Sequence, residues 1–396
     1  METLWLGREA NINPAQWQMK IGIVTFFCVP NYGAMLQAYA LWHYLKDRGH
    51  EVEFIDYAFG NTRRMPLWKC FFSRNIANWI GVVRKKLALR AQFEITQFSA
   101  SFPRTKRVST FPELIELGKR FDTIIVGSDQ MWNPLWCSKS SLPIVLLDFA
   151  AEKVKRISYA VSFGTREWQK EQNAELAGKL LRKFDAISVR EKSGAKLVYS
   201  LAGRNDAQIL LDPTLLYTST FYIPLFNVQT GNTKERYIFS YFLEDWTNNE
   251  NITSIVNVVS QYLGIQCIHS DKKAMNRLSA PICHLFNVKT KISVGAWLWE
   301  IANADFIVTN SFHGTVFAIL FHKPFVTMLI SGKMSGMNER VISLLQMVGL
   351  EARAINFNEI PKCRSIVANK IDWASVDKKL AIERLNSYDF IHTSLE

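Results

Sequence analysis

The chain has 396 residues, of which 48% are hydrophobic and 21% charged, and its net charge at pH 7 is +12. This length exceeds one ordinary hydrophobic core and predicts two domains, and the composition excludes a disordered chain. The sequence contains no apolar run long enough for a membrane span and no secretory signal pattern. Its six cysteines are scattered without a C-x-x-C spacing, so we expect reduced thiols in a cytoplasmic protein.

Buried strands and amphipathic helices alternate from residue 20 onward. A strand over 20–26, a helix over 31–49 and a strand over 50–57 form a βαβ unit, which predicts a parallel sheet. A helix is expected near 167–183, and further strands are expected over 121–129, 144–150, 155–163, 185–191 and 207–216. These strands end in polar turns, where an open α/β sheet places its ligands.

A second alternating set begins at residue 237, after a turn-rich break at 218–236. Strands are expected over 237–243, 265–270, 304–310 and 324–329, and helices near 246–263, after Gly314 and near 338–348. The predicted fold class is therefore α/β, with two Rossmann-like domains facing each other across a cleft. We assign an N-terminal extension at 1–19, domains at 20–225 and 237–372, and a C-terminal helix at 373–396.

Much of the positive charge lies in one segment of the first domain. From Arg63 to Arg107, eleven Lys or Arg residues occur with a single acid, Glu94, a local balance of +10. Residues 75–93 predict an amphipathic helix with basic neighbours, which is typical of contact with anionic lipid surfaces. A helix packed on its own domain with a solvated basic face explains the pattern equally well. No nucleic-acid partner is expected, because no known binding motif accompanies the charge.

The turn after the first strand places Asn31 and Gly33 at the start of a helix. A helix N-terminus offers unpaired N–H groups to an anion, and glycine lets the backbone approach closely, so both are candidate anion-binding residues. Asn31 could equally be an ordinary N-cap. The turn is neither G-x-G-x-x-G nor a P-loop, so a dinucleotide site is not predicted.

Five polar or aromatic residues lie at or just after the end of the segment 121–129: Ser128, Asp129, Gln130, Trp132 and Asn133. Asp129 is a candidate to orient a sugar hydroxyl or accept its proton, and the other four are candidate acceptor contacts. The alternative is an Asx-turn with the tryptophan packing nearby.

Arg190 stands just past the strand over 185–191. A guanidinium at that position can form a bidentate contact with a phosphate or carboxylate, and the alternative is a surface ion pair with Glu191.

The stretch VTNSFHGTVFAI (308–319) joins a predicted strand to a predicted helix through a polar turn. Ser311, Gly314 and Thr315 supply hydroxyl and N–H groups suited to a phosphate, and His313 stands beside them as a candidate acid or base. A lone histidine at such a turn is more often structural, so spacing by itself does not decide its role.

Seven segments occur in the order found in polysaccharide pyruvyl transferases, and the chain from about Lys20 to Arg353 therefore resembles that family. The segments are KIGIVTFFCVPNYGAMLQAYALWHYLKDRGHEVEFIDY, FDTIIVGSDQMWN, KRISYAVSFG, ISVREKSG, LDPTLL, IANADFIVTNSFHGTVFAILFHKPF and NERVISLLQMVGLEAR.

The resemblance implies a two-domain fold like that of GT-B glycosyltransferases. It also implies that phosphoenolpyruvate donates its three-carbon unit as a ketal across two sugar hydroxyls, often O4 and O6 of a hexose such as galactose. The family places the donor near Ser311, His313 and Gly314, with a basic residue at Arg190. Some members carry arginine where this chain has Ser311.

That departure leaves three basic residues to take the place of the missing guanidinium: Arg190, Arg340 or Lys333. In the implied reaction His313 protonates the methylene carbon of the donor, Asp129 accepts a proton from the acceptor, and Arg190 with the helix N-termini stabilises phosphate. No metal or cofactor is required.

The expected setting is assembly of a capsule or another exopolysaccharide in the cytoplasm. The acceptor is then a sugar, for example on a lipid-linked oligosaccharide, and the basic segment 63–107 could hold the enzyme at the inner face of the membrane. Two alternatives stay open: a GT-B nucleotide-sugar glycosyltransferase, and an inactive docking protein of the same fold.

Overall fold

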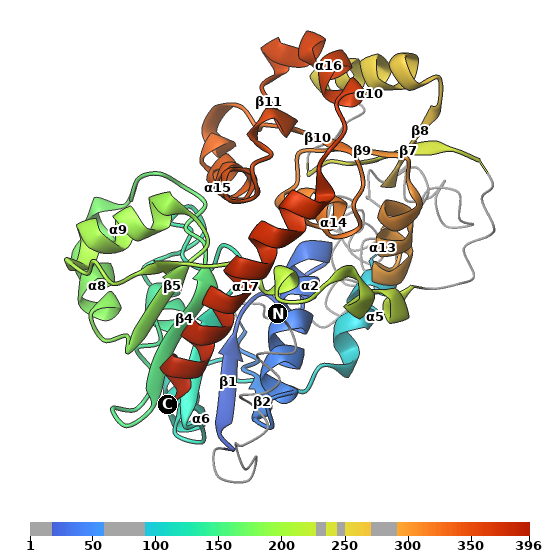
Figure 1. Cartoon of the computed structure of the whole chain (residues 1–396). Coiled ribbons are helices and arrows are strands. Elements are labelled where there is room, and N and C mark those ends of the chain that lie inside the picture. The colour runs from blue at the N-terminus through green and yellow to red at the C-terminus, as the bar shows by residue number, and fades with distance from the viewer. Residues whose placement is uncertain (1–17, 59–91, 227–234, 244–249, 271–290) are drawn as a thin grey trace, which may run out of the picture.

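The computed structural model describes residues 18–58, 92–226, 235–243, 250–270 and 291–396. Two parallel sheets organise these residues into two α/β domains (Figure 1). The first sheet has the strand order β2-β1-β3-β4-β5-β6, and the second has the order β11-β10-β9-β7-β8. The predicted fold class of two Rossmann-like domains is therefore confirmed. None of the described helices is both long and apolar enough to cross a membrane.

The first sheet contains the strands β1 (Lys20–Val24), β2 (Glu51–Phe54), β3 (Thr123–Gly127), β4 (Lys155–Val161), β5 (Ala186–Val189) and β6 (Gln208–Ile209). The described helices of this domain are α2 (Tyr32–Lys46), α5 (Phe93–Phe98), α6 (Phe111–Gly118), α7 (Leu142–Val145), α8 (Glu171–Leu181) and α9 (Lys192–Ala202). β3 is buried along its whole length, as expected for a strand of a parallel sheet covered on both faces.

The prediction of a strand over 144–150 is wrong. Residues 142–145 form the short helix α7, and turns follow it. Pro143 stands in the first turn of this helix, where its fixed φ favours a helical start. The apolar run that suggested a strand packs into the core of the first domain instead.

The second sheet contains the strands β7 (Tyr237–Tyr241), β8 (Gln266–His269), β9 (Phe306–Thr309), β10 (Phe325–Met328) and β11 (Ala354–Ile355). The described helices of this part are α10 (Glu250–Leu263), α13 (Val294–Asn303), α14 (Phe312–Leu320), α15 (Asn338–Val348), α16 (Cys363–Ala368) and α17 (Trp373–Leu395). α14 begins two residues before Gly314, so His313 lies in the first turn of the helix and not in a loop before it.

In each sheet the strand order reverses at one point, so that successive connections lead away from it on opposite sides. In the first sheet this point lies between β1 and β3, and in the second it lies between β7 and β9. Ligands of open α/β sheets bind outside the carboxyl ends of the strands at such switch points. The segment that follows β1 contains Gly33, and the segment that follows β9 contains His313.

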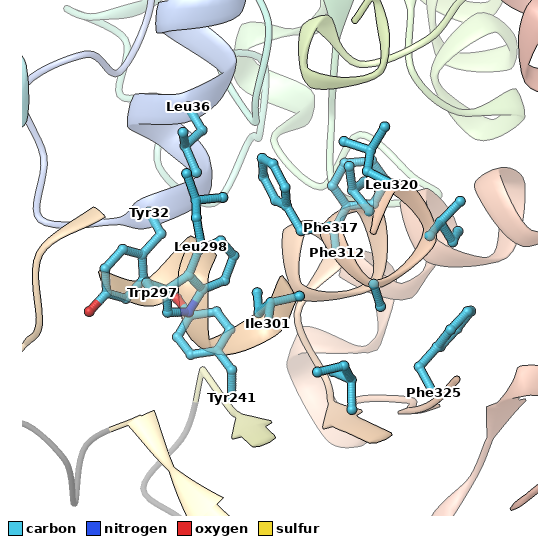
Figure 2. Close-up of a cluster of buried hydrophobic side chains, with 14 of the residues drawn as sticks. Tyr32, Leu36, Tyr241, Trp297, Leu298, Ile301, Phe312, Phe317, Leu320 and Phe325 are labelled. Carbon is cyan, nitrogen blue, oxygen red and sulfur yellow. The ribbon is translucent and has the colours of Figure 1, made fainter. Parts of the chain in front are cut away.

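The two domains share an apolar interface and a helix. The ring of Tyr32 on α2 stacks on Trp297 of α13 with centroids 4.8 Å apart, and Leu36 lies in the same buried cluster (Figure 2). α17 runs from the second domain back along the first (Figure 1). There, Arg384 Nε donates to the carbonyl of Leu215 at 2.7 Å. An interface of this kind fixes one relative position of the two sheets.

Candidate functional site

His313 contacts the first domain at Gly33. A Cβ added to Gly33 would lie 1.9 Å from Nδ1 of His313, so the imidazole rests against the bare backbone of α2. The histidine is 5% exposed. This contact brings the two switch points together, because α2 follows β1 and α14 follows β9. Gly33 therefore makes room for the imidazole, which the spacing of the turn did not indicate.

Asp212 joins this contact from the loop after β6. Its Oδ2 lies 3.6 Å from His313 Nε2 and 2.8 Å from Arg190 Nη2, and Ser128 Oγ is 3.2 Å away. Its Oδ1 accepts hydrogen bonds from the backbone and the hydroxyl of Thr214. One carboxylate thus contacts candidate residues from both domains.

Arg190 is a buried cation at the carboxyl end of β5. Its Nη2 donates to Ser128 Oγ as well as to Asp212, and its guanidinium lies 4.7 Å from the centre of the Phe312 ring. Nε and Nη1 have no hydrogen-bond partner among the described residues, and neither does His313 Nε2. Leaving buried N–H groups without partners costs free energy, so an anionic ligand that accepted hydrogen bonds from them would be stabilised.

The electrostatics of the cluster favour a permanent carboxylate at Asp212. Burial acts to raise the pKa of this group, but the nearby Arg190 and His313 outweigh burial and hold the pKa well below its ordinary value. Glu191 behaves differently: burial raises its pKa despite the two neighbouring arginines. Its Oε1 accepts from Ser162 Oγ and the backbone of Phe163, which ties the carboxyl to the domain interior.

Arg340 reaches the same place from α15 of the second domain. Its Nη1 lies 3.6 Å from Asp129 Oδ1, and its guanidinium lies 5.6 Å from the centre of the Phe312 ring. The amide of Gln130, turned with its oxygen toward the guanidinium, accepts from Arg340 Nη2 at 2.7 Å. Burial and the nearby Arg190 lower the pKa of Arg340 to about 10.

Two predicted acceptor contacts are held inside the first domain. Trp132 is packed in the core of this domain, where its Nε1 donates to the carbonyl of Val145 at 2.9 Å. Asn133 is fully buried, and its Oδ1 accepts from the backbone of Leu135. Both side chains therefore have structural partners, and a contact of either one with a sugar stays a prediction.

The predicted residues at the two helix N-termini have structural partners. Asn31 accepts from the backbone of Ala34, and Ser311 accepts from the backbone of Gly314, so both are N-caps. Thr315 is fully buried, and its hydroxyl bonds the carbonyl of Ser311 and the hydroxyl of Thr327. The hydroxyl of Thr315 is therefore bonded within its own domain, and its contact with a donor stays a prediction.

The structure assembles a cluster from three predicted residues, His313, Arg190 and Ser128, and brings Asp129 to it through Arg340. Sequence reasoning missed Asp212. A signal was present, because an Asp-Pro-Thr triplet directly after a strand is a turn in which the carboxylate accepts from the backbone. Within the described ranges, no group of three or more ligating side chains is placed to hold a metal ion.

The chemistry available to this cluster is proton transfer beside a bound anion. The imidazole can donate a proton, and two guanidinium groups can hold a phosphate or carboxylate.

Comparisons with known proteins concern the family and the fold of the chain. A sequence model of the polysaccharide pyruvyl transferase family matches residues 31–331. No curated protein sequence matches the chain. Among solved structures, a UDP-GlcNAc 2-epimerase from Methanocaldococcus jannaschii has a TM-score of 0.50 at 13% identity, covering 89% of this chain and 93% of its own.

ADP-heptose lipopolysaccharide heptosyltransferase II from E. coli matches 92% of this chain and 99% of its own with a TM-score of 0.39 at 14% identity. At such identities a likeness concerns the fold alone, and the fold is GT-B-like.

Proposed function

Because the chain belongs to the polysaccharide pyruvyl transferase family, we propose that it moves the pyruvyl group of phosphoenolpyruvate onto two hydroxyls of a sugar. The products are a cyclic ketal and phosphate. We propose the 4,6-ketal of a hexose such as galactose, formed during assembly of a capsule or another surface polysaccharide.

The observation that carries this proposal is the meeting of His313 with the Arg190–Asp212 pair. His313 comes from the second domain, and its Nε2 lies 3.6 Å from the carboxylate that binds Arg190 of the first. Pyruvyl transfer needs an acid beside a cation, because the donor is protonated on carbon while its phosphate departs. The cluster supplies both groups within one small volume.

In the proposed reaction His313 gives a proton to the methylene carbon of the donor, which makes C2 electrophilic. One sugar hydroxyl attacks C2 and phosphate leaves with the electron pair of the C2–O bond. The second hydroxyl then closes the ketal ring. One hydroxyl proton ends on phosphate, and the other is accepted by Asp129, which lies 14% exposed beside Arg340, and returns through solvent to restore the proton that His313 gave. Arg190 stabilises the departing phosphate.

Arg340 is the residue that we propose in place of the guanidinium that some family members carry at the position of Ser311. It is buried against the Phe312 ring, which Arg190 also contacts. Lys333, the other downstream candidate, is exposed on the 3-10 helix Gly332–Met337 before α15. Burial makes the charge of Arg340 stronger toward a bound anion than that of a solvated lysine.

The direct test combines purified protein, phosphoenolpyruvate and a panel of galactosides and lipid-linked glycans. We expect phosphate release that depends on the acceptor, and a sugar whose mass rises by that of pyruvate less one water. Turnover of a nucleotide sugar without any use of phosphoenolpyruvate would instead identify a glycosyltransferase and refute the proposal.

The variant His313→Gln tests the role of the imidazole. We expect a loss of ~10²–10⁴-fold in kcat, the range that a positioned general acid contributes. His322→Gln is the matched control, because His322 is an exposed histidine paired with Asp377 away from the cluster. Full activity of His313→Gln would show that another group supplies the proton or that the chain is an inactive docking protein.

We also propose that the acceptor is lipid-linked and that the basic segment 63–107 holds the enzyme at a membrane surface. Its predicted amphipathic helix lies largely in residues 59–91, outside the described residues. Of the described part, Arg104 is bound to Cys28 and packs on Phe27, so it is not a free surface charge. Sedimentation with anionic vesicles at low salt tests this idea, and indifference to anionic lipid would refute it.

A further inference from the structure

Asp212 contacts candidate residues of both domains but belongs to none of the roles assigned above. We propose that it is a positioning residue: its carboxylate holds the imidazolium of His313 and the guanidinium of Arg190 at one fixed spacing, so that acid and phosphate-binding cation act on the same donor molecule. This inference rests on the proposed function.

The carboxylate is locked in orientation by its own loop. Asp212 caps a short 3-10 helix over Pro213–Leu215, and Oδ1 accepts from the backbone of Thr214 at 2.9 Å. The hydroxyl of Thr214 donates to the same oxygen. With Oδ1 held by these two bonds, Oδ2 faces Arg190 and His313.

The contacts of Oδ2 are unequal in a way that suits a catalytic acid. Arg190 Nη2 lies at 2.8 Å, a charge-assisted hydrogen bond, whereas His313 Nε2 lies at 3.6 Å, beyond hydrogen-bond distance. The imidazole is therefore oriented by charge without being tied by a bond. Catalytic contacts in a structure without substrate are often long and shorten only when the complex forms.

Burial gives the interaction its strength. Asp212 is 1% exposed, and Arg190 and His313 are 3% and 5% exposed. Charges in such a place interact far more strongly than in water, but they are costly to bury and rarely improve stability over apolar packing. An ion cluster at the junction of two domains is therefore better explained by its chemistry than by its contribution to folding.

The charged groups around His313 oppose one another. Asp212, in the loop after β6, attracts a positively charged imidazole. Arg190 after β5 and Arg340 on α15 both lie against the adjoining Phe312 ring, and their positive charges oppose that of the imidazole. α2 presents only the backbone of Gly33. Removal of the carboxylate would leave the imidazole facing two guanidinium groups without the opposing negative charge.

The test is Asp212→Asn, which keeps the shape and the cap acceptor but removes the charge. We expect kcat to fall by ~10²-fold, and the alkaline limb of the pH–rate profile to move to lower pH. Combined with His313→Gln, the loss should be far smaller than the product of the two single losses, because both changes disable one unit. Asp372→Asn, which alters the N-cap of α17 far from the cluster, is the matched control.

Thermal melting separates misfolding from loss of chemistry. If Asp212→Asn does not fold, Thr214→Val is the second variant: it removes the hydroxyl bond to Oδ1 while the backbone bond and the charge remain, and we expect kcat to fall severalfold. The inference would be overturned if Asp212→Asn left the pH–rate profile unshifted and if the loss of kcat in the double variant equalled the product of the two single losses. Unchanged kcat in Thr214→Val would also overturn it. Absence of phosphate release by the unaltered protein would instead overturn the proposed function itself.

Discussion

The substitution Gly33→Ala should disable the enzyme while leaving it folded. A Cβ at this position would lie 1.9 Å from Nδ1 and 2.2 Å from Cγ of His313, where about 3.4 Å is ordinary contact. The imidazole must therefore retreat by about 1.5 Å, or α2 and α14 must separate by as much. Such a displacement exceeds the ~1 Å error that can cost 10²-fold in rate.

The cost in stability should be small. Overpacking of a close contact costs about 1–3 kcal/mol, and replacement of glycine by alanine in a helix regains up to about 1 kcal/mol. We therefore expect the free energy of unfolding to fall by roughly 0–2 kcal/mol, while kcat for phosphate release falls by ~10²-fold or more. Urea denaturation and a phosphate-release assay measure the two quantities on the same preparation.

Gly49→Ala is the matched control at the other end of α2. Its φ is +85°, and a Cβ there would meet nothing within 4 Å. Backbone strain should cost roughly 1–2 kcal/mol without moving the imidazole, so kcat should stay as in the unaltered protein. If Gly33→Ala and Gly49→Ala lose activity equally, or if Gly33→Ala keeps full kcat, the contact with His313 does not govern catalysis.

Three further outcomes follow from burial. Glu191→Gln should make the free energy of unfolding less dependent on pH. Because burial raises the pKa of Glu191 above its ordinary 4.5, the contribution of this group to stability falls as pH rises from there. Urea titrations between pH 4 and 7 should therefore show a flatter pH dependence in the variant. Trp132→Phe should leave the acceptor KM unchanged and lower stability by about 2–3 kcal/mol, since the bond to the carbonyl of Val145 and part of the buried indole volume are both lost; a raised KM would place Trp132 at the acceptor site. Trp297→Ala should lower the free energy of unfolding by about 3–5 kcal/mol and destabilise both domains together, because the indole is fully buried against Tyr32. Separate unfolding transitions of the two domains in tryptophan fluorescence and circular dichroism would contradict a shared core.

Local patterns were sufficient for most of the elements. The alternation of buried strands and helices from residue 20 predicted both parallel sheets, and β9 and α14 were expected on the two sides of the turn that contains His313. The run over 144–150 misled, because a short apolar stretch has no periodicity that separates a strand from a buried helix or turn.

Side chains after strand ends were harder to assign than the strands themselves. Trp132 and Asp129 follow the same strand, yet one fills the core and the other meets Arg340 of the second domain. A sequence states the order of these residues but not which way each one points after a turn. Direction at such places depends on what packs against the turn.

The amino-acid sequence by itself determined the two α/β domains, the family to which the chain belongs, and His313 and Arg190 as candidate residues, because periodicity and motifs are properties of neighbouring residues. Only the tertiary structure decided that Gly33 makes room for the imidazole and that Asp212 joins His313 to Arg190. These contacts link residues far apart in the chain, and they exist because packing of α2 against α14 sets the relative position of the two sheets.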